Sequence, residues 1–157
     1  MRAPCLPPHD AAQAGSSAVE FALVLTLMIS LLSVALDVGM AFWYYDALLK
    51  GTRDAARFLS AADKATIASV GVPAAKQQLV DAATAAGLPS VTAANVQVTC
   101  LDSALADASC ADGTAPGGVR VKIAGYTFVT GRYVPFVIAG APTVFTLAPS
   151  ATMRYIR

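Results

Sequence analysis

The sequence predicts an α+β protein built on one long apolar helix, and three features of the chain predict it. No charged residue occurs between Phe21 and Leu36. Apolar residues then recur every three or four positions as far as about Ala62, which is typical of a helix. After residue 95 they alternate with polar residues, as in half-buried strands. We therefore expect a long N-terminal transmembrane helix that continues as a stalk, followed by a small head in which a helix packs on an antiparallel sheet.

The composition favours a membrane protein and argues against nucleic acid as a partner. Hydrophobic residues make up 56% of the 157 residues and charged residues only 13%, about half the share usual in soluble domains. The mean hydropathy is +0.59. A net charge of +1 offers no concentrated basic surface of the kind that phosphate binding requires.

The chain divides into a leader over residues 1–15, a transmembrane helix over 16–45, a helical stalk over 46–62 and an α+β domain over 63–157. Residues 1–14 contain three prolines and no apolar periodicity, so we expect a disordered leader without helix.

The apolar run is long enough to cross a membrane. Phe21 to Leu36 covers about 24 Å as a helix, and Ala18 to Tyr45 exceeds the roughly 30 Å hydrocarbon core. An aromatic cluster then lies at the far interface, where amphipathic rings are favoured: Phe42, Trp43, Tyr44 and Tyr45. Asp37 has two interpretations, an intramembrane partner for another subunit or, preferred here, a side chain that reaches the headgroups.

The head is predicted from a second helix and several strands. Pro73 opens the helix, strong helix formers continue it to Ala86, and Gly87 and Pro89 end it. The alternating segments are Val96 to Cys100, Val119 to Ile123 with the same pattern running on through Phe128, Val144 to Leu147 after Pro142, and Ala151 to Ile156. The first two of these segments are expected to pair.

Cys100 and Cys110 both follow the apolar helix and lie in a loop-rich region. In an oxidising compartment they would form a disulfide worth roughly 2 to 3 kcal/mol, and two free thiols are the alternative. A metal site is disfavoured because the single histidine, His9, lies far from this pair.

Little in the chain suggests catalysis. His9 lies in the leader, no glycine-rich phosphate loop occurs, and the acidic residues are scattered singly. We expect no enzyme activity, no cofactor and no small-molecule substrate.

One acid stands at the entrance of the apolar helix. Gly15 is followed by four small or apolar residues, then Glu20, Phe21 and the uncharged run. This string resembles the processing site of type IV prepilins and pseudopilins, in which a membrane aspartyl peptidase cuts after the glycine. The resemblance implies that Ser16 becomes the first mature residue and that the Glu20 carboxylate matches the new terminal ammonium of its own or a neighbouring chain. An uncleaved anchor with its acid at the headgroups is the alternative.

Further motifs assign the resemblance to one group of pseudopilins. The string GSSAVEFALVLTLMISLL, then Asp37 and Gly39, the RDAARF segment with Arg53 and Arg57, and the terminal ATMRYIR are similar to TadE/TadG-like pseudopilins of the tight-adherence (Flp) pilus system. The short chain favours TadE within that group. Two features depart from the group's common pattern: no basic residue stands just before Gly15, and Thr26 stands where a helix proline is frequent.

This resemblance implies a pilin-like, single-pass protein of the inner membrane, with a cytoplasmic N-terminus and a periplasmic head. Its implied partners are other pilins or pseudopilins, the Tad assembly machinery and the prepilin peptidase. Its implied role is that of a minor pseudopilin in pilus biogenesis, acting by subunit packing. The charges after the helix, Lys50, Arg53 and Arg57, point the opposite way by the positive-inside rule.

Two further alternatives stay open. Arg53 and Arg57 lie on one helix face and form either a solvated or salt-bridged face, preferred here, or a contact with the head. Ser33 and Ala35 satisfy a small-x-small pattern, so the chain could instead be a secreted binding or enzyme domain behind an ordinary signal peptide, or a plain anchored periplasmic adaptor.

Overall fold

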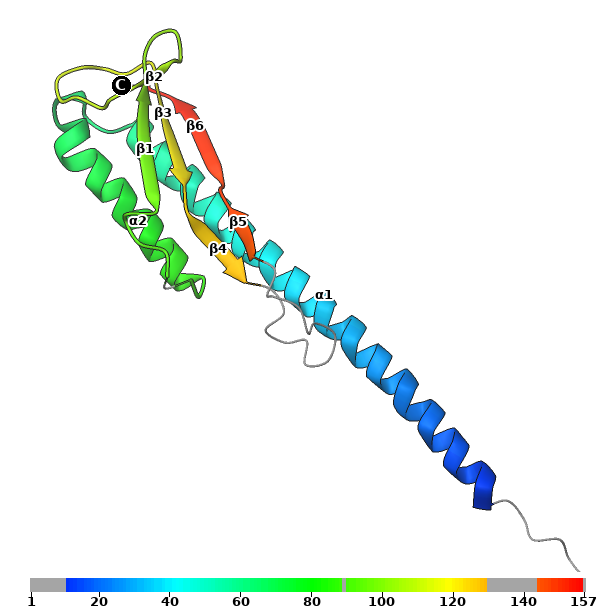
Figure 1. The fold of residues 1–157 in the computed structure, drawn as a ribbon. Helices are drawn as coiled ribbons and strands as arrows, with labels where there is room; N and C mark the ends of the chain where they lie inside the picture. Colours follow the sequence, from blue (N-terminus) through cyan, green and yellow to red (C-terminus); the bar gives the residue numbers. More distant parts are fainter. Residues whose placement is uncertain (1–10, 89, 130–143, 157) are drawn as a thin grey trace, which may run out of the picture.

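A single long helix runs through most of the molecule. The computed structural model describes residues 11–88, 90–129 and 144–156. Within them α1 (Ala11–Ser60) has 50 residues and is therefore about 75 Å long. Its first half projects beyond the head, and its second half packs against it (Figure 1). Neither Gly39 nor Gly51 interrupts the helix. The predicted α+β architecture, a long apolar helix followed by a small head, is confirmed.

The helix begins earlier than expected. Residues 11–14 were expected to belong to a leader without helix, and they are helical. Three of these four residues are alanines, which have the highest helix propensity, and the last leader proline is Pro8. The predictions made for residues 1–10, including Cys5 and His9, lie outside the described residues.

Two short helical turns lead from α1 to the second helix. After α1 ends at Ser60, a 3-10 turn (η1, Lys64–Thr66) leads into a single π-helical turn (η2, Ile67–Gly71) and then α2 (Val72–Ala85). The predicted helix therefore exists, with Pro73 in its first turn. Gly87 ends it with a φ of 86°, which lets the Leu88 amide donate to the Ala83 carbonyl.

The main sheet has four antiparallel strands in the order β2-β1-β3-β6: β2 (Asp107–Ala108), β1 (Val96–Leu101), β3 (Gly118–Ile123) and β6 (Ser150–Arg154). The predicted pairing of the first two long strands is confirmed, with Val98 opposite Val121. The short β2 lies within what was expected to be loop, where it pairs with the end of β1.

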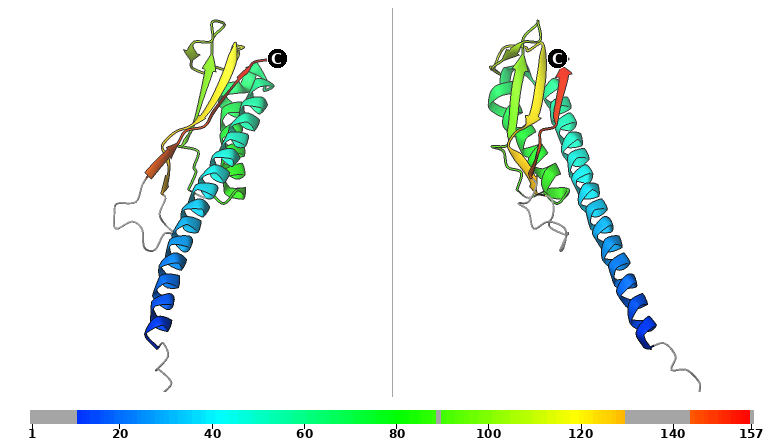
Figure 2. Two further views of the ribbon diagram at one scale, coloured as in Figure 1. Left: turned by 90° about the vertical axis from the view of Figure 1, so that its right-hand side faces the viewer. Right: turned by 45° about the vertical axis from the view of Figure 1, so that its right-hand side comes forward.

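Both helices cover one face of this sheet, as the turned views in Figure 2 show. Val119, Val121 and Ile123 of β3 are buried against them, whereas Arg120 and Lys122 point to the other face. The core joins α1, α2 and the sheet through Leu48, Ala55, Leu59, Ile67, Leu79, Val91, Val96, Val119, Val121 and Ile123.

A second, two-stranded sheet extends the head along α1 toward the apolar half of the helix (Figure 1). It consists of β4 (Tyr126–Val129) and β5 (Val144–Leu147). The sequence predicted that the pattern begun at Val119 would run unbroken to Phe128. Instead Gly125, with a φ of 72°, breaks it, because this left-handed conformation turns the chain out of the main sheet. We call β4 and β5 the ribbon. Pro89 and Pro142 lie outside the described residues.

The last strand is attached to the end of α1. The Tyr155 hydroxyl donates a 2.6 Å hydrogen bond to the Ala62 carbonyl, and the Ile156 amide donates to the Ser60 carbonyl at 3.0 Å. The strand predicted as far as Ile156 ends at Arg154, and the Ile156 amide bonds to the end of α1 instead of to a strand.

Candidate functional site

The first half of α1 presents its apolar side chains to the outside. Nearly every large hydrophobic residue from Val19 to Phe42 is about half exposed or more, including Phe21, Leu23, Leu27, Leu31 and Leu36. The helix is long and apolar enough to cross a membrane. An apolar surface of this extent on one helix is matched by lipid or by other apolar helices.

A narrow stripe on the same helix is buried, and it runs toward the head. Ser33 and Asp37 begin it, and Leu48, Ala55 and Leu59 continue it at helical spacing. Asp37 is only 5% exposed. The preferred interpretation, that this carboxylate reaches the headgroups, is therefore wrong, because Asp37 lies on the side of α1 that the molecule itself covers.

The expected processing site lies on the exposed helix start. Gly15, Ser16 and Glu20 are all exposed, and Phe21 is 67% exposed. A Cβ built at Gly15 would meet no atom within 4 Å, so the surroundings of this glycine are open. Gly15 is helical here. A peptidase that reads an extended backbone must therefore unwind the first turns of α1 before it can cut.

Glu20 and Asp46 illustrate two kinds of acid on this helix. Asp46 forms a 2.6 Å ion pair with Lys50 one turn later, and both side chains are exposed. Within the described ranges, no basic side chain forms an ion pair with Glu20. An acid between apolar neighbours that will lie in or near hydrocarbon is costly unless a cation meets it. Glu20 thus differs from Asp46, whose charge is met by Lys50.

Arg53 and Arg57 lie on the outer face of α1. Both are exposed, whereas Ala55 and Ala56 between them are fully buried in the core. Arg57 and Asp54 border a shallow depression beside α2. The solvated face preferred from the sequence agrees with this exposure, and the alternative contact with the head does not.

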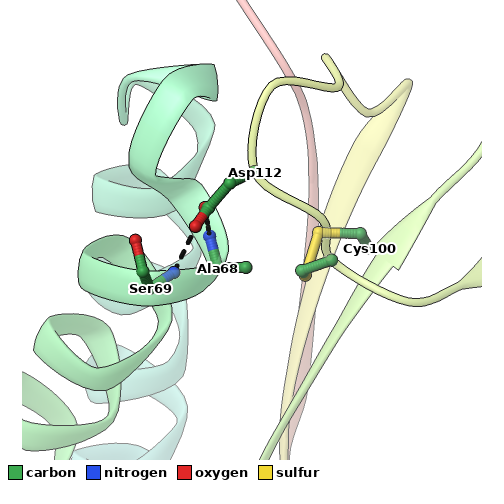
Figure 3. The surroundings of a disulfide bond; sticks show 5 residues. Ala68, Ser69, Cys100 and Asp112 are labelled. Atoms are coloured by element: carbon green, nitrogen blue, oxygen red, sulfur yellow. Dashed lines mark hydrogen bonds between the residues drawn. A yellow bond between two sulfur atoms is a disulfide. The ribbon is translucent and has the colours of Figure 1, made fainter.

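Cys100 and Cys110 form a disulfide, as one of the two interpretations of the sequence predicted. It ties the end of β1 to the long loop before β3 (Figure 3). The free-thiol alternative is thereby excluded.

A second attachment of the same loop was not foreseen. Figure 3 shows Asp112 turned toward the turn before α2, where its carboxylate accepts hydrogen bonds from the Ala68 and Ser69 amides at 2.7 and 3.2 Å. A hydrogen bond with the Ser69 side chain, together with these two amides, lowers the pKa of Asp112 below its usual value. The Gly113 amide adds a bond to the Lys64 carbonyl. The dipeptide Asp112-Gly113 is a turn signal that could have indicated a fixed bend here.

Metal ligands do not gather in the described part of the chain. Across residues 11–88, 90–129 and 144–156, no group of three His, Cys, Asp or Glu side chains could hold a metal ion. The features that stand out are therefore the exposed apolar face of α1 and Glu20 near its start.

The helix start, the aromatic cluster and the exposed arginines all lie within one stretch that a family comparison identifies. Residues 15–57 match the sequence model of the family described as TadE-like protein. This segment is TadE-like. The resemblance inferred from the motifs is confirmed for this segment. No curated protein and no solved structure matches the chain.

The TadE-like segment covers most of α1. It starts at Gly15, includes Glu20 and Phe21, and ends at Arg57, three residues before the end of the helix. It thus contains the exposed apolar half and the part of the helix that packs in the head. The rest of the head, including the disulfide, lies outside the match.

Proposed function

We propose that the chain is a minor pseudopilin-like membrane protein that serves the biogenesis of a Tad pilus by packing its helix against other subunits. The observation that carries this proposal is the exposed apolar half of a TadE-like helix with the unmatched Glu20 at its start. The partners are other pilins or pseudopilins and the assembly machinery. The mature protein acts by assembly and performs no catalysis.

Processing by the prepilin peptidase supplies the missing cation. A cut between Gly15 and Ser16 leaves an ammonium at Ser16, about one turn before Glu20. In a low-dielectric helix bundle two such charges stabilise the assembly only when they meet each other. The ammonium of one subunit and the carboxylate of another, or of the same chain, satisfy this requirement. The open surroundings of Gly15 support access by the peptidase.

The head lies in the periplasm, and the N-terminus lies in the cytoplasm. The disulfide supports this orientation, because disulfides persist in oxidising compartments. Lys50, whose charge argues for the opposite orientation, is paired with Asp46. Arg53 and Arg57 lie on the part of α1 that is packed into the folded head.

Determination of the mature N-terminus tests this function. We expect the protein to start at Ser16 when the prepilin peptidase is present and to keep its leader when the peptidase gene is deleted. The measurement is intact mass of membrane-extracted protein from both strains.

Two other results would contradict the proposal. A mature chain starting at Leu36 would identify an ordinary signal peptide and a secreted domain. Full-length protein in both strains would identify a plain membrane anchor. A Gly15→Leu variant is the matched control, because its side chain obstructs the cut without disturbing the exposed helix around it.

A further inference from the structure

An apolar groove separates α1 from the ribbon, and its position along the helix is informative. It has a volume of about 380 Å³ and is lined by Val38, Ala41, Phe42, Tyr45, Phe145, Thr146 and Leu147. Its walls carry no charged side chain, and they come from two segments far apart in the sequence. The ribbon thus reaches the same level of α1 as residues 38–45.

That level is where a transmembrane helix leaves the hydrocarbon. A core of roughly 30 Å takes about 20 helical residues, so a span beginning at Ala18 ends near Val38. The groove starts at Val38 and ends at Tyr45. The aromatic residues of this level, Phe42 and Trp43, are 70% and 68% exposed. Exposed aromatic rings are favoured where lipid headgroups meet acyl chains.

The groove also continues the apolar outer surface of the helix. Leu27, Leu31, Val34, Val38, Phe42 and Tyr45 follow one another at spacings of three and four residues, and all are exposed. The stripe that faces lipid in the span therefore leads directly into the groove. No other surface of the head that the structure describes offers such continuity: the outer face of the main sheet carries Arg120, Lys122 and Thr152.

The ribbon brings its own apolar side chains to this level. Phe128 and Phe145 are paired across the two strands and therefore share the face toward α1. Phe128 lies against Tyr44, with ring centroids 5.6 Å apart. Phe145 is 52% exposed, and on the opposite face Val129 and Val144 are about half exposed. A strand pair in water would leave this much apolar surface uncovered.

We propose that the groove is filled by the acyl chains of the bilayer leaflet from which α1 emerges, so that the ribbon is a second membrane contact beside the helix. This inference rests on the membrane span of the proposed function. It goes beyond that function, because a second contact fixes the orientation of the head on the membrane. With the helix as the only contact, the head is free to tilt relative to the membrane surface.

Tryptophan quenching in vesicles tests the proposal on the full chain. Trp43 is the only tryptophan, so a Trp43→Phe background gives single-tryptophan variants at other positions. The protein is reconstituted in phosphatidylcholine and phosphatidylglycerol vesicles whose acyl chains are brominated near the carbonyl end or near the methyl end. Phe145→Trp reports the ribbon and Leu27→Trp the middle of the span. Val70→Trp, at an exposed position of η2, is the control outside the membrane.

The expected result is a loss of F145W emission comparable to that of Trp43 in the unmodified protein, stronger with bromine near the carbonyl end. L27W is quenched most by bromine near the methyl end, and V70W emission is unchanged. The same pattern in Leu147→Trp, a second ribbon position that lines the groove, guards against a local disturbance at Phe145. An intact disulfide and an unchanged unfolding temperature identify the variants that are correctly folded.

Three results overturn the proposal. Quenching of L27W without quenching of F145W and L147W leaves the span intact and removes lipid from the groove. Quenching of F145W that appears only at the lowest protein density identifies a second copy of the chain as the occupant. Absence of quenching in L27W refutes the span itself, and the inference fails with it.

Discussion

The two halves of α1 both carry leucines, but the surroundings of these leucines are opposite. Leu27 and Leu31 in the first half are 57% and 58% exposed, whereas Leu48 and Leu59 in the second half are 1% and 0% exposed. The helix itself is continuous between them. The difference therefore comes from what lies beside each half, and in the second half that is the sheet and α2.

This difference shows where the hydrophobic free energy of each half is used. Burial of a leucine side chain stabilises by about 1.5 to 3 kcal/mol. In the second half that stabilisation already holds the head together. In the first half the leucines are not buried by the head, so that stabilisation remains available for contacts with lipid or with other apolar helices.

A matched pair of leucine substitutions gives the largest expected effect on the head. Leu59→Ala should destabilise it by about 2 to 5 kcal/mol, because Leu59 is fully buried and truncation leaves a cavity. That corresponds to a fall of roughly 10 °C or more in the unfolding temperature. Leu27→Ala, the same change on the exposed half, should leave this temperature unchanged. The measurement is thermal unfolding in detergent micelles, followed by near-ultraviolet circular dichroism. Equal effects of both substitutions would refute the separation of the two halves.

Removal of the disulfide should have a smaller effect, and again only on the head. Cys100→Ala together with Cys110→Ala removes the cross-link and should lower the free energy of unfolding by roughly 2 to 3 kcal/mol in the chain-entropy account. The Asp112 hydrogen bonds to η2 remain and keep part of the loop in place. Urea unfolding of the head in micelles measures the change, with the reduced unmodified protein as the control. A change in the amount of protein that inserts into membranes would show that the loop matters beyond the head.

Glu20→Gln should have the smallest effect on head stability and a large effect on assembly. Glu20 is exposed and lies far from the core, so the unfolding temperature should not change. In an assembly the neutral side chain would leave a terminal ammonium unmatched, and breaking a buried ion pair costs about 3 to 5 kcal/mol. Asp54→Asn, an exposed acid on the packed half, is the control. Co-purification with other pilins and the yield of pili are the measurements. Normal pilus formation in Glu20→Gln would contradict the charge-matching argument.

The sequence predicted the elements that depend on local patterns. The uncharged run predicted the exposed half of α1, and alternation predicted β1 and β3 together with their pairing. These features follow from periodicity, which is local. The disulfide was one of two interpretations, because the spacing of the two cysteines permits a bond but does not show that the sulfur atoms lie close together. The fold shows that they do.

The features that were missed depend on contacts between distant segments. From its position in the sequence, Asp37 was expected near the membrane interface. Only the fold shows that its side chain is buried. Tyr126 follows Ile123 by three positions instead of two, so the alternation changes phase at Gly125, and the prediction of one continuing pattern overlooked this shift. Asp112 bonds to amides more than forty positions earlier in the chain, which no local rule predicts.

The attachment of the last strand to the end of α1 has a mechanical consequence. Tyr155 and Ile156 bond to the carbonyls of Ala62 and Ser60, and β6 runs beside the helix in the same direction (Figure 1). A force that pulls α1 along its axis is therefore transmitted to the sheet at the end farthest from the membrane. It loads the contacts between helix and strands in shear, so that many must yield together instead of separating one by one.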